Sequence, residues 1–138
     1  MRILGLDVGS KKIGLAISDE LGITAQPLKV ILRKDYEEIA GLLGQYDIKE
    51  IVVGLPLNMN GTEGGAVKEV AAFVDSLKKE VKIPIKMWDE RLTTMSIEKE
   101  LIRADVSRKK RKRCIDKLAA QLILQSYLDK ARIGKCIN

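Results

Sequence analysis

The hydrophobic pattern at the start of the chain predicts β-strands. Residues 3–8 form a short apolar run broken by Asp7, and residues 12–18 then alternate between large apolar and small or polar side chains. Two such runs separated by a Gly9-Ser10 turn are typical of a hairpin. Residues 24–33 fit a third strand, in which Pro27 favours a strand start or an edge strand because proline donates no ladder hydrogen bond.

Later segments alternate between helical spacing and apolar runs. Residues 35–46 carry apolar residues at helical spacing, which predicts a helix with Asp35 as its N-cap. The same reasoning gives helices over 66–81, 96–103 and 115–131, strands over 50–56 and 83–90, and a glycine-rich loop over 58–65. This order predicts an α/β fold with a mixed five-stranded sheet flanked by helices, in a single domain over residues 1–138.

The positive charge of the chain is local. Lys and Arg exceed Asp and Glu by 25 to 19, a net charge of +6, and the run from Arg108 to Arg113 accounts for that whole excess. A concentrated basic patch favours a nucleic-acid partner, because it can neutralise phosphates. The alternative is a solvated loop. Aromatic residues make up only 4% of the chain, which argues against extensive stacking of single-stranded bases.

Residue types that are missing narrow the chemistry. The sequence has no histidine, which excludes Ser-His-Asp and Cys-His catalysis and imidazole-bound zinc. Its two cysteines are too few for a disulfide scaffold, and no signal peptide or membrane span is predicted. We therefore expect a cytoplasmic protein without a membrane partner, whose chemistry depends on carboxylates, Lys, Arg, hydroxyls or a bound metal.

Asp7 is an acid within a predicted core strand. By strand alternation it shares a face with Gly5, and if the hairpin pairs it with Gly14 and Ala16, small residues leave space around the carboxylate. Such space suits a hydrated metal ion or a phosphate backbone. The alternative is that Asp7 only caps the turn that follows it.

Three further acids are candidate partners of Asp7. Asp89 and Glu90 end the last predicted strand, where ligand sites of α/β sheets gather, and the alternative is a solvated strand end. Asp116 begins the final predicted helix on its apolar side, where an acid also interacts favourably with the helix dipole. If these segments converge, hard carboxylate oxygens would suit Mg²⁺ or Mn²⁺ and phosphoryl-transfer chemistry.

Four motifs in order resemble one family. The segments DVGSKKIGLAISD, VVGLPLNMNGTEG, DERLTT and DKLAAQLILQSYL look like the YqgF-type family of ribonuclease H-like proteins. Its members are described as Holliday junction resolvases and as nucleases that process the ends of precursor 16S rRNA. The match runs from Leu4 to about Leu128, which is nearly the whole chain.

The resemblance implies a ribonuclease H-like fold and metal-dependent phosphodiester hydrolysis. Its motifs assign Asp7, Glu90 and Asp116 as catalytic residues and ligands of Mg²⁺ or Mn²⁺. In the related RuvC resolvases an acid follows the fourth strand, whereas VVGLP here has none, so the choice between Asp89 and Glu90 stays open. The residues expected near the nucleic acid are Lys11, Asn58, Arg91, Arg108, Lys109, Lys110 and Arg111.

Several functions remain open at the level of sequence. The first is a nuclease acting on structured RNA, such as precursor rRNA, or a resolvase acting on branched DNA, as a monomer or weak homodimer. A second is a phosphotransferase or ATPase, because Asp7 through Gly14 also resembles the phosphate loop of sugar kinases and actin-like proteins. Those proteins need two such domains around a nucleotide cleft, and this chain has the length of one. The third is a non-catalytic nucleic-acid-binding module, for which the basic run would suffice.

Overall fold

The computed structural model describes residues 1–55, 65–89, 107 and 118–131. Its elements are β1 (Arg2–Val8), β2 (Lys12–Ser18), β3 (Ala25–Leu32), the 3₁₀ helix η1 (Arg33–Asp35), α1 (Glu38–Tyr46), β4 (Ile48–Leu55), α2 (Gly65–Lys78) and β5 (Ile85–Asp89). A last helix, called the final helix below, is described over residues 118–131.

The strands form one mixed sheet in the order β3-β2-β1-β4-β5. β1 pairs antiparallel with β2 and parallel with β4, and β4 pairs parallel with β5. This confirms the predicted mixed five-stranded sheet. Pro27 lies on β3, an edge strand, as its missing N–H predicted.

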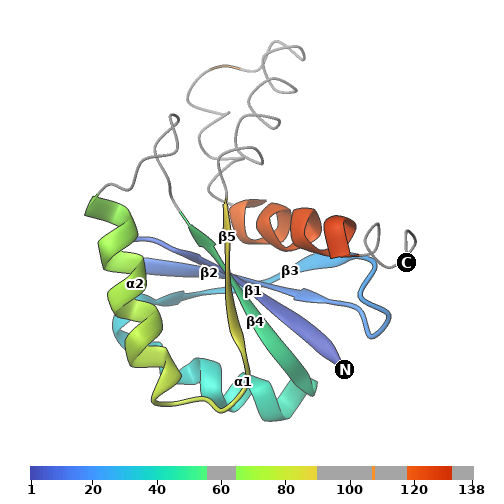
Figure 1. Cartoon of the computed structure of the whole chain (residues 1–138), viewed down its shortest axis with the longest axis horizontal. Helices are drawn as coiled ribbons and strands as arrows, with labels where there is room; N and C mark the ends of the chain where they lie inside the picture. The colour runs from blue at the N-terminus through green and yellow to red at the C-terminus, as the bar shows by residue number, and fades with distance from the viewer. Residues whose placement is uncertain (56–64, 90–106, 108–117, 132–138) are drawn as a thin grey trace.

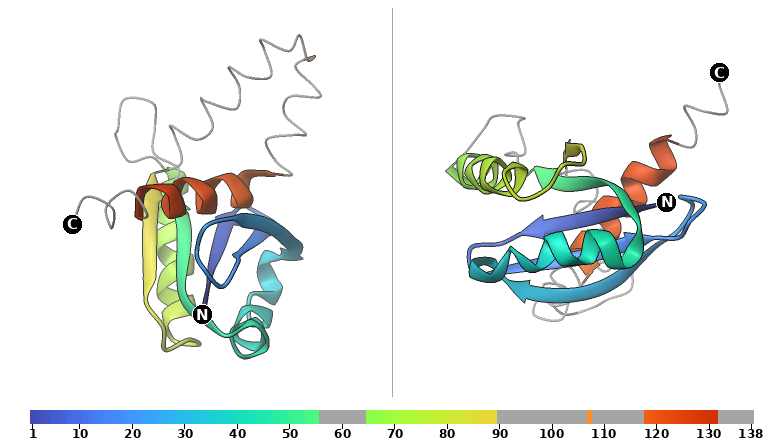
Figure 2. Two further views of the ribbon diagram at one scale, coloured as in Figure 1. Left: turned by 90° about the vertical axis from the view of Figure 1, so that its right-hand side faces the viewer. Right: turned by 90° about the horizontal axis from the view of Figure 1, so that it is seen from below.

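Helices cover both faces of the sheet (Figure 1), where α2 lies to the left and the final helix, in red, lies at the upper right. One face packs against α1 and α2 through large aliphatic side chains, including Leu4, Leu6, Ile51, Val53 and Leu77. The other packs against the final helix through Ile3, Ala16, Ala25, Val52, Ala120, Ile123, Leu124 and Leu128. The two views in Figure 2 show the final helix crossing the strands away from α1 and α2.

The final helix approaches the sheet closely and is held by side-chain amides. A Cβ atom at Gly5 would lie 2.8 Å from Leu124 Cβ, so only glycine admits the helix at this point of β1. Gln125 Oε1 accepts the Ala25 N–H at 2.8 Å, and Gln125 Nε2 donates to the Ile23 carbonyl at 2.9 Å. Gln121 Nε2 donates to the Ala25 carbonyl at 3.1 Å. These bonds attach the helix to the start of the edge strand β3.

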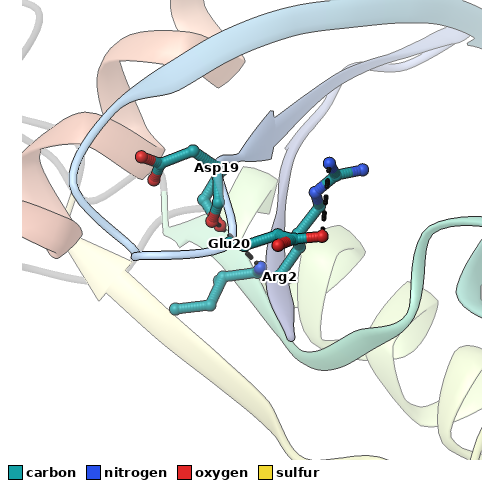
Figure 3. A network of polar contacts seen from close by, with 5 residues as sticks. Arg2, Asp19 and Glu20 are labelled. Carbon is teal, nitrogen blue, oxygen red and sulfur yellow. Dashed lines mark hydrogen bonds and ion pairs between the residues drawn. The ribbon is translucent and has the colours of Figure 1, made fainter.

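The turn between β2 and β3 is fixed by Asp19 (Figure 3). Its carboxylate accepts the N–H groups of Ile23 at 2.7 Å and Thr24 at 3.2 Å. The Ile23 N–H is the main reason that the pKa of Asp19 lies below its usual value. Arg2 of β1 reaches Glu20 in the same turn at 3.9 Å, so the turn is tied to the amino end of the central strand.

Some predicted boundaries were wrong. Asp35 is not the N-cap of α1: residues 33–35 form η1, α1 begins at Glu38, and its N-cap position is Glu37, whose side chain makes no capping bond. α2 ends at Lys78, before the predicted limit of residue 81, and β4 begins two residues earlier than predicted, at Ile48. The predicted helix over 96–103 and residues 115–117 of the last predicted helix lie outside the described residues.

Candidate functional site

Asp7 lies on the central strand of the sheet. Its backbone pairs with Gly14 of β2, and on the other side Leu6 of β1 pairs with Val53 of β4. The residue is partly exposed. Because strand residues alternate, Asp7 shares its face with Gly5 and Ile3, which is the face that the final helix covers.

Small residues surround this face, but they do not all leave space. At Gly5 the final helix fills the volume that a side chain would occupy. A Cβ atom on Gly5 would lie 2.8 Å from Leu124 Cβ and 3.3 Å from the Ala120 carbonyl oxygen. Near Asp7 the packing is looser: a Cβ atom on Gly14 would lie 3.6 Å from Ala120 Cβ and 3.8 Å from Asp7 Cβ. The expected open space is therefore smaller than predicted: the helix fills the Gly5 end of the row, and at the Gly14 end a Cβ atom would meet ordinary contacts.

The β1–β2 turn presents Lys11 close to Asp7 in the chain. The Gly9 N–H donates to the Lys12 carbonyl at 2.8 Å, and a Cβ atom on Gly9 would lie 2.9 Å from that carbonyl oxygen. Glycine is therefore required for this turn. The turn leaves Ser10 and Lys11 exposed at the edge of the sheet where β1 ends.

The parallel strands end at the same edge. Leu55 of β4 pairs with Asp89 of β5, and Gly54 pairs with Trp88 one residue earlier. Trp88 packs against the final-helix cluster, and its Nε1 donates to Ser126 Oγ at 3.2 Å. The carboxyl ends of the parallel strands β1, β4 and β5 thus lie side by side at one end of the sheet, with Asp7 near the end of β1 and Asp89 at the end of β5.

Most of the predicted site residues lie outside the described part of the chain. These are Asn58, Glu90, Arg91, Arg108, Lys109, Lys110, Arg111 and Asp116. Asp7 and Lys11 are described, and Asp89 is placed as the last residue of β5. Within the described residues no group of three or more His, Cys, Asp or Glu side chains forms a metal site.

A charged network that was not predicted holds the final helix to β4 and β5. Tyr127 of the helix donates to Glu50 Oε1 at 2.9 Å and accepts a bond from Lys86 Nζ at 3.1 Å, and Lys86 lies 3.3 Å from Glu50 Oε2. The bond to Tyr127, followed by Glu50, raises the pKa of Lys86. Burial raises the pKa of Tyr127. The sequence held a signal for these docking contacts, because the polar-tipped side chains of Tyr127 and Gln121 stand next to the apolar stripe of the predicted helix.

Within the described ranges, every helix falls short of the length and hydrophobicity that a membrane crossing demands.

Comparisons with known proteins agree with this architecture. The model of a family described as RuvX, Holliday junction resolvase, matches residues 1–130. A protein of Desulforamulus reducens named "Putative pre-16S rRNA nuclease" is 55% identical over 133 residues, which cover 94% of this chain and 97% of that protein. A protein of Halothermothrix orenii with the same name is 53% identical over 133 residues, which cover 94% and 95%.

Solved structures share the fold. Thermus thermophilus RuvC in complex with a Holliday junction substrate aligns with a TM-score of 0.60 at 16% identity, covering 97% of both chains. The fowlpox virus Holliday junction resolvase aligns with a TM-score of 0.52 at 15% identity, covering 94% of this chain and 99% of that one. The expected ribonuclease H-like fold is thereby confirmed.

Proposed function

Because the chain belongs to the RuvX Holliday junction resolvase family, we propose that it is a metal-dependent nuclease that hydrolyses phosphodiester bonds, with precursor 16S rRNA as its substrate. The names of relatives more than 50% identical to it favour this substrate. Branched DNA, cleaved as a Holliday junction resolvase, is the second candidate, which the family description favours. The observation that carries the proposal is a partly exposed carboxylate, Asp7, on the central strand of a ribonuclease H-like sheet.

The surroundings of Asp7 fit a divalent metal ion. Carboxylate oxygens are the hard ligands that Mg²⁺ and Mn²⁺ prefer. Gly14 places no side chain beside Asp7, and a Cβ atom there would make only ordinary contacts, 3.6 Å from Ala120 Cβ and 3.8 Å from Asp7 Cβ, so no bulky group crowds the carboxylate from β2. We assign Asp7, Glu90 and Asp116 as the residues that hold it. When bound, the ion supplies a nucleophilic water at neutral pH and stabilises negative charge on the phosphate oxygens.

Strand parity supports Glu90 over Asp89 as the ligand on β5. Trp88 packs on the final-helix face, which is also the face of Asp7. Strand residues two apart lie on the same face, so if the alternation continued beyond Trp88, Glu90 would lie on the face of Asp7. Asp89 is the position of opposite parity.

Helical spacing supports Asp116 in the same way. Ala120 approaches the position of a Gly14 side chain, next to Asp7. Residues four apart are neighbours on one side of a helix, so if the final helix began before Asp116, Asp116 would lie on the same side as Ala120. The three acids would come from three separate segments and meet over the Gly14 end of the small-residue face.

The basic residues would bind the substrate backbone. We propose that six basic residues and one amide contact this backbone, namely Lys11, Asn58, Arg91, Arg108, Lys109, Lys110 and Arg111. Lys and Arg bind phosphates without reading the bases, so these contacts would position the strand over Asp7. We further propose a single domain over residues 1–138 that works in the cytoplasm as a monomer or weak homodimer.

The test incubates the purified chain with precursor 16S rRNA and with a four-way DNA junction, in Mg²⁺, in Mn²⁺ and with a chelator. We expect metal-dependent cleavage of the rRNA, lost in Asp7→Asn, which keeps the size of the side chain but removes the charge. Asp47→Asn is the matched control: it precedes β4 at the opposite edge of the sheet, and asparagine tolerates its φ of 52°. Near-normal cleavage by folded Asp7→Asn would contradict the metal role, and cleavage of the junction alone would favour the resolvase.

A further inference from the structure

We propose that a pocket beside the β1–β2 turn binds one unpaired nucleotide of the nucleic-acid substrate, an inference that rests on the proposed nuclease function. The pocket has a volume of about 660 Å³ and lies between the β1–β2 turn, the end of β3 with η1, and α2. This volume is within the roughly 300–1,000 Å³ of small-molecule sites. The pocket is distinct from the small-residue face around Asp7. It is lined by α2, and α2 packs on the other face of the sheet.

One wall of the pocket is aromatic and apolar. Tyr36 meets Phe73 of α2 edge to face, with ring centroids 5.7 Å apart. Phe73 is buried, whereas Tyr36 is partly exposed, so Tyr36 is the ring that can contact a bound base. Base stacking on an aromatic ring tolerates any base, because every base has a flat π-face. The scarcity of aromatic residues in the chain limits such stacking to one or very few nucleotides.

The rim of the pocket is positively charged. Lys11 and Lys34 are both exposed there, and among the described residues neither has an ion-pair partner. Arg33 is less available to a ligand, because its guanidinium already donates to the carbonyls of Gly9 and Glu69 at 3.3 and 3.1 Å. The side chains of the described residues that line the pocket include cations and hydroxyls but no carboxylate. This combination fits a phosphate attached to a base rather than an uncharged ligand.

The pocket is mechanically joined to the strand that carries Asp7. The Arg33 N–H donates to the Lys11 carbonyl at 2.8 Å, and the Arg33 side chain holds the Gly9 carbonyl. The turn so fixed starts two residues after Asp7. A strand whose backbone lies over Asp7 could therefore place an unpaired neighbouring nucleotide in the pocket.

The test compares the binding of two labelled RNA duplexes by fluorescence anisotropy, one blunt and one with a short single-stranded tail. Ser76→Leu fills the pocket without changing charge, and Lys34→Gln removes a rim cation; Lys49→Gln, at the opposite edge of the sheet, is the charge-matched control. We expect the parent to prefer the tailed duplex. Ser76→Leu should lose about tenfold in affinity for that duplex, the scale of one stacked base, and Lys34→Gln should lose less, because it removes one phosphate contact and leaves Tyr36 in place. Both variants should bind the blunt duplex normally.

Three results would overturn the inference. They are no tail preference in the parent, an equal loss on both duplexes in the pocket variants, or the same selective loss in Lys49→Gln. Displacement of the tail by micromolar adenosine 5′-monophosphate would assign the pocket to a free nucleotide and also overturn it. Asp7→Asn should keep the tail preference whether or not the parent cleaves, so a failure of the proposed function is visible separately.

Discussion

The two faces of the sheet are built from different materials. The face under α1 and α2 is filled by large aliphatic side chains such as Leu6, Ile51 and Leu77, all fully buried. The face under the final helix carries Gly5 and Ala16 on its central strands and relies on glutamine, tyrosine and lysine side chains to dock the helix.

This difference separates stability from chemistry. Burying one leucine stabilises a fold by about 1.5–3 kcal/mol, whereas one intramolecular hydrogen bond contributes about 0.5–1.5 kcal/mol net. Among the described residues the aliphatic face has the larger set of buried apolar side chains, so it contributes the larger share of hydrophobic stabilisation. The small-residue face gives up burial, but it leaves room beside Asp7, where large side chains would cover the carboxylate.

The largest expected effect comes from the same truncation made on each face. Leu77→Ala and Leu124→Ala both remove a fully buried leucine side chain, and each should lower the free energy of unfolding by about 2–5 kcal/mol. Urea denaturation measures this loss. Only Leu124→Ala should also lower cleavage per folded molecule, because it loosens the helix that packs beside Asp7. Equal specific activities in the two variants would remove the proposed division of roles.

Two glycine substitutions distinguish packing from chemistry on the face under the final helix. Gly5→Ala would place a Cβ atom 2.8 Å from Leu124 Cβ, so it should cost about 1–3 kcal/mol of stability. Gly14→Ala meets only ordinary contacts at 3.6 and 3.8 Å and should leave stability nearly unchanged. Because it fills the space beside Asp7, it should nevertheless reduce cleavage. Thermal unfolding and cleavage rates of both variants check this, and a fully active Gly14→Ala would show that the space is not used.

The smallest expected effect is a dependence of stability on high pH. The folded-state pKa values of Lys86 and Tyr127 are raised above 10.5 and 10.0, so the folded state binds these protons more tightly than the unfolded state. Their contribution is present at neutral pH and is lost as the pH rises through the folded-state values. We expect the free energy of unfolding to fall above about pH 10, with a shallower fall in Tyr127→Phe. Identical slopes for parent and variant would contradict this account of the network.

The hairpin, the mixed five-stranded sheet and the position of Asp7 could be predicted because they depend on local patterns. Alternation along residues 12–18 and the turn at Gly9 specify the hairpin, and the missing N–H of Pro27 specifies an edge strand. The start of α1 could not be predicted from Asp35. The chain first forms the short helix η1, and a capping pattern in the sequence does not show whether an α-helix or a 3₁₀ turn follows. Local sequence also gave no reason for β4 to begin at Ile48, which pairs with Arg2.

The candidate site was predictable only in part. Asp7 was identified because a carboxylate in an apolar strand is unusual. The docking roles of Gln125 and Tyr127 were missed, because they depend on which strand lies beneath the helix, and that contact joins residues about 100 positions apart. The pairing of Arg33 with the β1–β2 turn was missed for the same reason.

The proposed metal site requires a second acid on the face of Asp7, and Asp89 and Glu90 are the two candidates. Mn²⁺ binding by calorimetry, with cleavage measured in parallel, compares Glu90→Gln with Asp89→Asn, two neighbouring changes that each remove one negative charge. We predict that Glu90→Gln behaves like Asp7→Asn, with weaker Mn²⁺ binding and a loss of cleavage beyond the roughly 10- to 100-fold that an outer-shell partner costs. Asp89→Asn should remain close to the parent. Loss in Asp89→Asn with a normal Glu90→Gln, or equal mild losses in both, would contradict a shared site on the face of Asp7.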